Sequence, residues 1–218
     1  GSMNGATAEL FRIGAITSSS ILAPARCAAE ACALAKEGGI PAGVHWTLHA
    51  EWADEPWEAS SGNAAPSLLK EGRLFADAAA MAKAARGADV TRELEAQYRF
   101  LCDNGCAPDH ADSHGGTLYG VNGRFFFLNA FRVCGAHSLP FRFAKSNAFI
   151  SRQMGGTIPR ALELAHRAIV KAAESKRVPL LDELVTHPLP VEKIEGYEAM
   201  CAYCERELLK CGPGIAEI

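Results

Sequence analysis

Three side chains of metal-binding type occur in two short segments of the chain. His45 lies in the segment GVHWTL, and Asp112 and His114 lie in the segment DHADSHGGT. Neutral imidazoles bind divalent ions such as Zn²⁺ or Mg²⁺, and a neighbouring carboxylate can orient one of them. An ion held in this way polarises a carbonyl and lowers the pKa of a water from about 16 towards about 7. We therefore predict that His45 and His114 are metal ligands and that Asp112 orients a ligand, with direct ligation by Asp112 as the alternative.

The local patterns around these residues predict the strands that position them. Apolar and polar residues alternate between Gly43 and Leu48, which is typical of a strand with His45 on its polar face. A second strand is expected over residues 109–114. Alternate side chains of this strand share one face, and they are His110, Asp112 and His114. Both strands lead into loops, which is where a parallel α/β barrel carries its active-site groups.

Two further histidines stand close to these segments. In an extended strand, His110 is about 13 Å from His114, which is too far for both to bind one ion. His49 follows the first strand, and we leave it open between a site residue and a solvent-facing loop residue. Arg142 is equally open between holding a substrate hydroxyl or carboxylate and pairing with an acidic side chain.

The whole chain alternates helical and strand patterns, which predicts an α/β fold. Helices are expected at 5–12, 24–37, 91–105, 125–133, 157–174 and 197–210, and strands at 15–22, 43–48, 109–114, 140–145, 178–185 and 214–218. Thr91 is the expected N-cap of the third helix. The segment 51–86 is expected to form a loop excursion over the site.

Composition restricts the classes of partner. The 218 residues carry 22 basic and 25 acidic side chains, so we expect neither a nucleic acid nor a membrane surface as partner. No long apolar run or signal-peptide pattern occurs, and we expect a cytoplasmic protein. The eight cysteines are expected to be reduced, and the Cys201-x-x-Cys204 pair to lie on a helix rather than in a zinc knuckle.

Three segments resemble the YdjC-like carbohydrate deacetylase family, in order and at similar separations. They are GAITSSSILAP from Gly14, GVH ending at His45, and PDHADSH ending at His114. The resemblance implies a single domain over residues 1–218, a TIM-barrel-like (β/α)7 deacetylase barrel. It also implies a divalent metal ion, Zn²⁺ or Mg²⁺, held by one aspartate and two histidines that correspond to His45 and His114. The implied activity is hydrolysis of N-acetyl groups on amino-sugar oligosaccharides, with a small carbohydrate as substrate.

Two motifs of the family depart from this sequence. The metal aspartate and a general-base aspartate belong to an Asp-Asp-Phe-Gly type motif, which is absent, so we expect a barrel incomplete at its termini and an inactive chain. The family also uses a histidine of a Glu-x-x-x-His-Pro type motif to protonate the leaving amine. His187, in ELVTHP, is the catalytic candidate. A competing alignment, which we favour, places that motif just past Ile218 and makes His187 an ordinary strand-end or loop residue.

Two other functions stay open at this stage. One is a non-catalytic sugar-binding barrel that has lost the aspartates. The other is a different metal-dependent TIM-barrel enzyme, such as a sugar isomerase, which is disfavoured because no set of glutamates stands at the strand ends. A homodimer also stays open.

Overall fold

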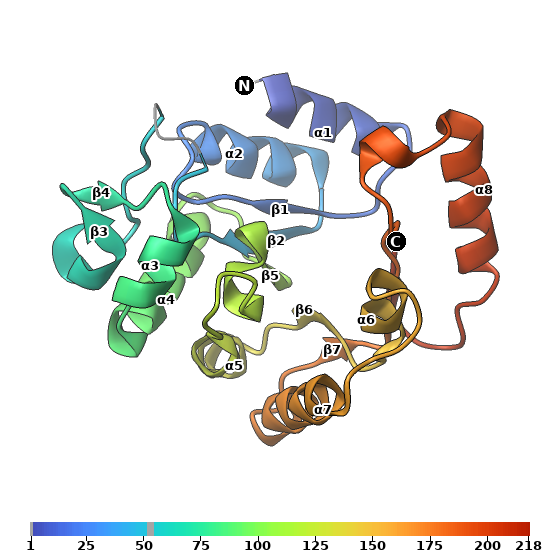
Figure 1. Ribbon diagram of the computed structural model, residues 1–218. Coiled ribbons are helices and arrows are strands. Elements are labelled where there is room, and N and C mark those ends of the chain that lie inside the picture. Colours follow the sequence, from blue (N-terminus) through green and yellow to red (C-terminus); the bar gives the residue numbers. More distant parts are fainter. Residues whose placement is uncertain (1, 52–54) are drawn as a thin grey trace. The chain divides into compact units, whose positions relative to one another are not determined.

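The structure is a computed structural model, and it describes residues 2–51 and 55–218 (Figure 1). The chain divides into two compact units. Unit 1 comprises the described residues up to Phe141 together with Lys176–Val178, and unit 2 comprises Arg142–Ser175 and Pro179–Ile218.

A parallel sheet forms the centre of unit 1. Its strands are β1 (Ser19–Ile21), β2 (Ala42–Trp46), β5 (Ala111–Ser113) and the beginning of β6 (Phe141–Ala144), and they lie side by side in that order. All three pairings are parallel. The connections contain α2 (Ala28–Gly38), α4 (Gly87–Asp103) and α5 (Phe127–His137). Parallel strands joined through helices confirm the predicted α/β fold.

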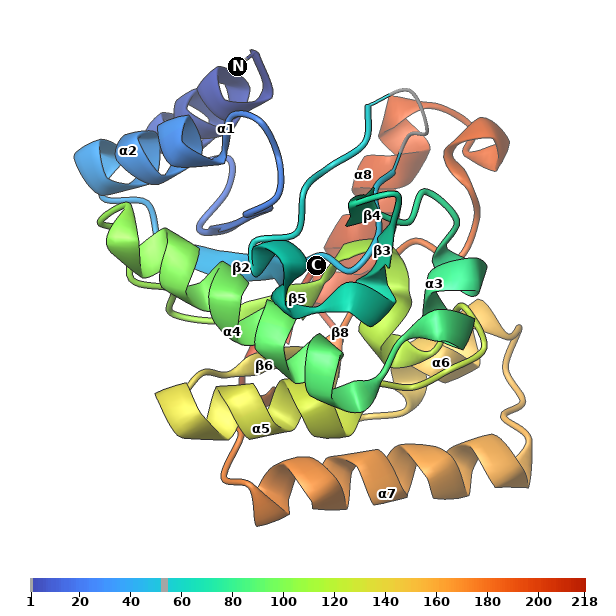
Figure 2. The same cartoon turned by 90° about the vertical axis from the view of Figure 1, so that its left-hand side faces the viewer.

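The alternation in β2 explains why this strand is central. Val44, Trp46 and Leu48 are fully buried, whereas His45 on the other face is only partly buried. The Trp46 indole Nε1 donates to the backbone oxygen of Leu94 at 3.0 Å, which ties β2 to α4. α4 packs against both β2 and α5 (Figure 2). One face of β2 therefore belongs to the core and leaves the other face for polar side chains.

Two predictions made for the segment before β5 are wrong in detail. Thr91 does not cap α4, because the helix begins at Gly87 and the Thr91 hydroxyl donates to the Gly87 oxygen at 3.1 Å within it. The predicted loop excursion over 51–86 contains regular elements in its described part, while residues 52–54 lie outside the described residues. These elements are η1 (Gly62–Ala64), η2 (Pro66–Leu68), the antiparallel pair β3 (Leu69–Lys70) and β4 (Arg73–Leu74), and α3 (Ala78–Ala84).

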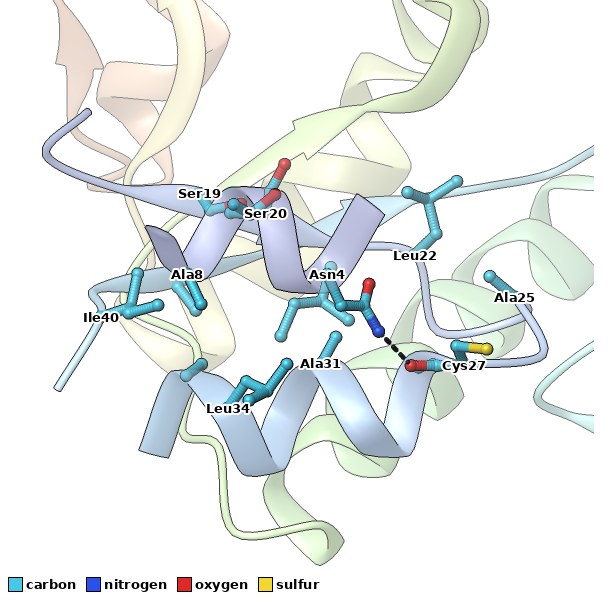
Figure 3. Close-up of a pocket in the computed structure, with 15 residues that line it drawn as sticks. Asn4, Ala8, Ser19, Ser20, Leu22, Ala25, Cys27, Ala31, Leu34 and Ile40 are labelled. Atoms are coloured by element: carbon cyan, nitrogen blue, oxygen red, sulfur yellow. Dashed lines mark hydrogen bonds between the residues drawn. The ribbon is translucent and has the colours of Figure 1, made fainter. Parts of the chain in front are cut away.

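A cavity of about 120 Å³ lies between α1 (Ser2–Arg12), β1 and α2 (Figure 3). α1 buries none of its side chains. The Asn4 amide donates to the Cys27 oxygen at 3.0 Å and to Glu30 Oε2 at 2.6 Å, so polar contacts fasten α1 to α2.

Unit 2 contains the rest of β6 and its sheet neighbour β7 (Leu180–Leu181), together with a separate parallel pair, β8 (Glu183–Leu184) and β9 (Ala216–Glu217). Its other elements are α6 (Ala148–Gln153), α7 (Arg160–Ser175), η4 (Val191–Lys193) and α8 (Tyr197–Leu208). The single strand expected over 178–185 is split at Asp182, whose carboxylate accepts from the Ile215 backbone N–H at 2.9 Å and from Lys145 Nζ at 2.8 Å. Across the described helices of both units, none is long and apolar enough to span a bilayer.

Candidate active site

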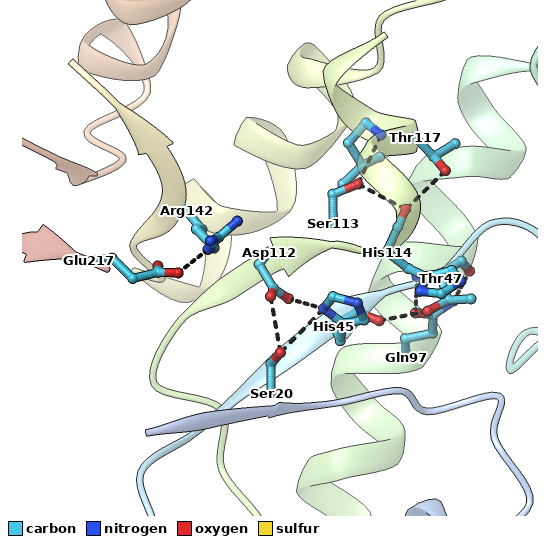
Figure 4. A network of polar contacts seen from close by, with 11 residues as sticks. Ser20, His45, Thr47, Gln97, Asp112, Ser113, His114, Thr117, Arg142 and Glu217 are labelled. Atoms are coloured by element: carbon cyan, nitrogen blue, oxygen red, sulfur yellow. Dashed lines mark hydrogen bonds and ion pairs between the residues drawn. The ribbon is translucent and has the colours of Figure 1, made fainter. Parts of the chain in front are cut away.

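His45 and Asp112 face each other across neighbouring strands. The parallel register pairs residue 45 of β2 with residue 112 of β5, and His45 Nδ1 lies 2.7 Å from Asp112 Oδ1 (Figure 4). Ser20, on β1, places its hydroxyl 3.0 Å from Asp112 Oδ2 and 3.2 Å from His45 Nδ1. A carboxylate beside Nδ1 favours a proton on that nitrogen, which leaves a lone pair on Nε2. This is the form of histidine that binds metal ions.

His114 follows β5 directly and opens the short helix η3 (His114–Tyr119). Its ring centre lies 5.4 Å from that of His45, with the two planes at 74°. Two imidazoles that bind one ion at about 2.1 Å in tetrahedral geometry have ring centres roughly 5 Å apart. The two histidines are therefore close enough to share one ion at the carboxyl ends of β2 and β5.

The surroundings of His114 favour its neutral form. Burial lowers the pKa of His114 to about 4, and the neighbouring His45 and His49 rings act in the same direction. A neutral imidazole has a nitrogen lone pair for an ion, whereas an imidazolium does not. The form of His114 that is favoured at this position is therefore the form that can bind a metal ion.

His49 belongs to this cluster, so it is a site neighbour and not a solvent-facing loop residue. Its ring centre is 5.2 Å from that of His114, and burial lowers the pKa of His49. The Thr117 hydroxyl donates to the His114 oxygen at 3.0 Å and lies 3.2 Å from His49 Nδ1. These contacts tie His49 to η3, the short helix that begins at His114.

Trp57 is the aromatic neighbour of the same histidine. Its ring centre lies 5.8 Å from that of His114, and only 7% of the residue is exposed. Sequence reasoning named neither Trp57 nor Ser20 as a site residue, although Trp57 belongs to the segment 51–86 that was expected to lie over the site. Neither a run of three serines nor a single tryptophan in a long connection has a spacing that predicts a site. The strand register brings Ser20 to the histidines, and the fold of the connection brings Trp57 to them.

His110 was predicted to share a strand face with Asp112 and His114, but its side chain makes different contacts. Its Nδ1 is 2.5 Å from Asp109 Oδ1, and its ring covers Gly43 so closely that a Cβ at residue 43 would lie 2.5 Å from it. The structure thus gives His110 a packing role next to β2.

His187 and Arg142 belong to unit 2. His187 Nδ1 accepts from the Leu189 backbone N–H at 3.1 Å, and its ring packs against Tyr203 with centres 4.4 Å apart. Arg142 Nε donates to Glu217 Oε1 at 2.5 Å, so this arginine pairs with an acidic side chain.

The described residues fit a metal ion only in part. Between residues 2 and 51 and between 55 and 218, no group of three His, Cys, Asp or Glu side chains is arranged to hold an ion by itself. Catalytic zinc centres use three protein ligands and keep one position open. His45 and His114 supply two nitrogens, and a third ligand has to come from elsewhere.

Together, the parallel sheet and the polar cluster at its strand ends define an α/β protein with a candidate site at the carboxyl ends of its strands. The model of one family, described as YdjC-like protein, matches residues 1–204, and the chain belongs to this family. It is also similar in fold to a crystal structure from Enterococcus faecalis V583, described as a "putative cellobiose-phosphate cleavage protein". That match covers 98% of this chain and 72% of the other, with 20% identity and a TM-score of 0.71. No curated protein matches the chain significantly.

Proposed function

We propose that this protein is a metal-dependent hydrolase that removes N-acetyl groups from amino-sugar oligosaccharides. The observation that carries the proposal is the pair of imidazoles, His45 and His114, at adjoining strand ends with ring centres 5.4 Å apart. Membership of the YdjC-like family supports the choice of a carbohydrate substrate. The structural neighbour from Enterococcus faecalis, whose name refers to a phosphorylated disaccharide, is consistent with it.

Each residue of the site has a role in this proposal. His45, through Nε2, and His114 would hold a divalent ion, Zn²⁺ or Mg²⁺, which would supply Lewis acidity towards an amide carbonyl and water. Asp112 is a positioning residue, because its contact at 2.7 Å fixes both the orientation and the tautomer of His45. Ser20 in turn holds the second oxygen of Asp112. His187 stays a candidate for the acid that protonates the leaving amine.

The metal site can be tested without turnover. Titration of the protein with Zn²⁺ in a calorimeter should show one site, which the His45→Ala and His114→Ala variants lose. Asp112→Asn should weaken binding by about 10- to 100-fold, because the amide no longer selects the His45 tautomer. Lys145→Met, a change in unit 2, serves as the control and should bind as tightly as wild type. Unaltered Zn²⁺ binding in both histidine variants would refute the site.

The substrate class needs its own experiment. We expect acetate release from N-acetylated chitooligosaccharides by the protein expressed from its intact gene, and a loss of at least about 100-fold in kcat/KM in His114→Ala. Binding of these sugars without any acetate release would instead favour a non-catalytic sugar-binding protein.

A further inference from the structure

Glu93 of α4 is a carboxylate with no exposed surface. Its Oε1 accepts from the Ser60 backbone N–H at 2.9 Å and from Gln97 Nε2 at 2.7 Å. Its Oε2 accepts from the Ser61 N–H at 2.9 Å and from the Ser61 hydroxyl at 2.6 Å. All four of these donors are neutral. A buried carboxylate is destabilising unless such hydrogen bonds hold it, so the position of residues 60 and 61 is tightly coupled to Glu93.

Gln97, one turn further along α4, is also fully buried and holds the other end of the same segment. Its Oε1 accepts from the Thr47 N–H at 2.9 Å, and its Nε2 donates to the Thr47 oxygen at 2.6 Å. Thr47 comes directly after β2, where the ladder to β5 ends at Trp46 and Ser113. The side-chain amide therefore takes the place of a neighbouring strand for this residue, two positions after His45.

Two of the described rings that pack on His114 belong to residues between these two anchors. They are those of His49 and Trp57, with ring centres 5.2 Å and 5.8 Å from that of His114. Because Glu93 and Gln97 are hydrogen-bonded to each other and lie one turn apart on one helix, the two anchors form one connected network.

We propose that Glu93 and Gln97 are positioning residues that hold His49 and Trp57 against His114 and so shape the substrate side of the site. This inference deepens the proposed function and rests on it, because the proposed function identifies His114 as part of the site. The hydrogen bonds of the pair go to specific backbone atoms of residues 47, 60 and 61, so they fix the position of these residues as well as satisfying buried polar groups.

The same helix offers a matched control. Asp89, one turn before Glu93, is 7% exposed, accepts from the Ser67 N–H at 3.0 Å and pairs with Arg92 at 2.8 Å. It therefore fastens α4 to a neighbouring segment through the same kind of contact, but not to residues 47–61. Asp89→Asn should lower stability as Glu93→Gln does, but it should leave the surroundings of His114 unchanged.

The test observes the ring protons of His114 by NMR, assigned with the His114→Ala variant. Trp57→Ala gives the reference, because removing the indole abolishes its ring-current effect on His114. Glu93→Gln and Gln97→Leu should move the His114 resonances towards that reference, and Asp89→Asn should leave them in place. Ser61→Ala removes one donor to Glu93 and offers a milder variant should the others fail to fold. In kinetics, kcat/KM should fall by about tenfold or more in Glu93→Gln and Gln97→Leu, and stay near wild type in Asp89→Asn.

The proposal is overturned if the His114 resonances of folded Glu93→Gln, Gln97→Leu and Ser61→Ala coincide with those of wild type. It is also overturned if Asp89→Asn shifts them equally. The NMR readout does not depend on turnover. Shifted resonances in a protein that deacetylates no sugar would support the positioning role and refute the proposed function alone.

Discussion

Gly43 has no side chain, and this leaves room for the His110 ring beside β2. A Cβ at this position would meet three atoms of the His110 ring at 2.5 to 2.7 Å. Gly43→Ala should therefore lower the free energy of unfolding by about 1–3 kcal/mol, since either the ring or the strand has to shift. Urea denaturation measures this change.

A second glycine provides the control for that measurement. Gly5 lies inside α1, where an added Cβ meets nothing within 4 Å, so Gly5→Ala should stabilise the protein by about 0.5–1 kcal/mol. The double variant Gly43→Ala/His110→Ala should be less affected by the alanine at 43 than the single one. An equal loss with and without the His110 ring would contradict the steric explanation.

The site was only partly predictable at the level of residues. The alternation around His45 and the spacing of Asp112 and His114 predicted that the two histidines stand near strand ends with Asp112 on the same face, and the structure pairs residues 45 and 112 in register. His49 stayed open between a site residue and a loop residue, because its side chain reaches His114 from the turn after β2, which no periodicity describes. Gln97 was not predicted, because an amide in an amphipathic helix gives no sign that it serves as a strand partner for Thr47, 50 positions away.

At the level of elements, the strands and helices that were predicted occur in the expected order, but α3, α6 and the β3–β4 pair were not predicted and several ends were wrong. The helix expected from Pro24 begins at Ala28, while its end at Gly38 with Gly39 at φ 62° follows the glycine pair. The helix expected from Phe125 begins two residues later and continues to His137. Glycine stops a helix by its backbone conformation, which can be expected from the sequence, whereas these two helices begin without a side-chain cap that would mark their start.

α3 is the element whose start depends most clearly on one side chain. Asp77 Oδ1 accepts from the N–H groups of Ala79 and Ala80 at 2.8 and 3.1 Å. Asp77→Ala should destabilise α3 by about 1 kcal/mol, and Asp77→Asn should change little because asparagine caps equally well. Hydrogen exchange of the α3 amides is the measurement, and similar exchange in the two variants would show that the cap contributes nothing.

At the level of the whole molecule, the apolar core is distributed unevenly between the two units. The largest fully buried side chains of the described residues, among them Trp46, Leu94 and Phe131, all belong to unit 1. The buried apolar residues of unit 2 are fewer and include small side chains: Ala144, Ala173, Leu180, Leu184, Val185 and Tyr203. Since burial of apolar surface is the main stabilising contribution, unit 2 is expected to be the less stable unit.

Urea unfolding should therefore proceed in two stages. The tryptophans stand at positions 46, 52 and 57, so their fluorescence reports on the part of the chain that forms unit 1. Amides of α7 and α8 should lose their protection from hydrogen exchange at lower urea than the fluorescence change. Tyr203→Ala removes a buried ring whose hydroxyl bonds to the Thr186 oxygen at 2.9 Å, and should lower only the first midpoint. A single transition seen alike by both probes, and shifted as a whole by Tyr203→Ala, would mean that the chain unfolds as one cooperative body despite its uneven core.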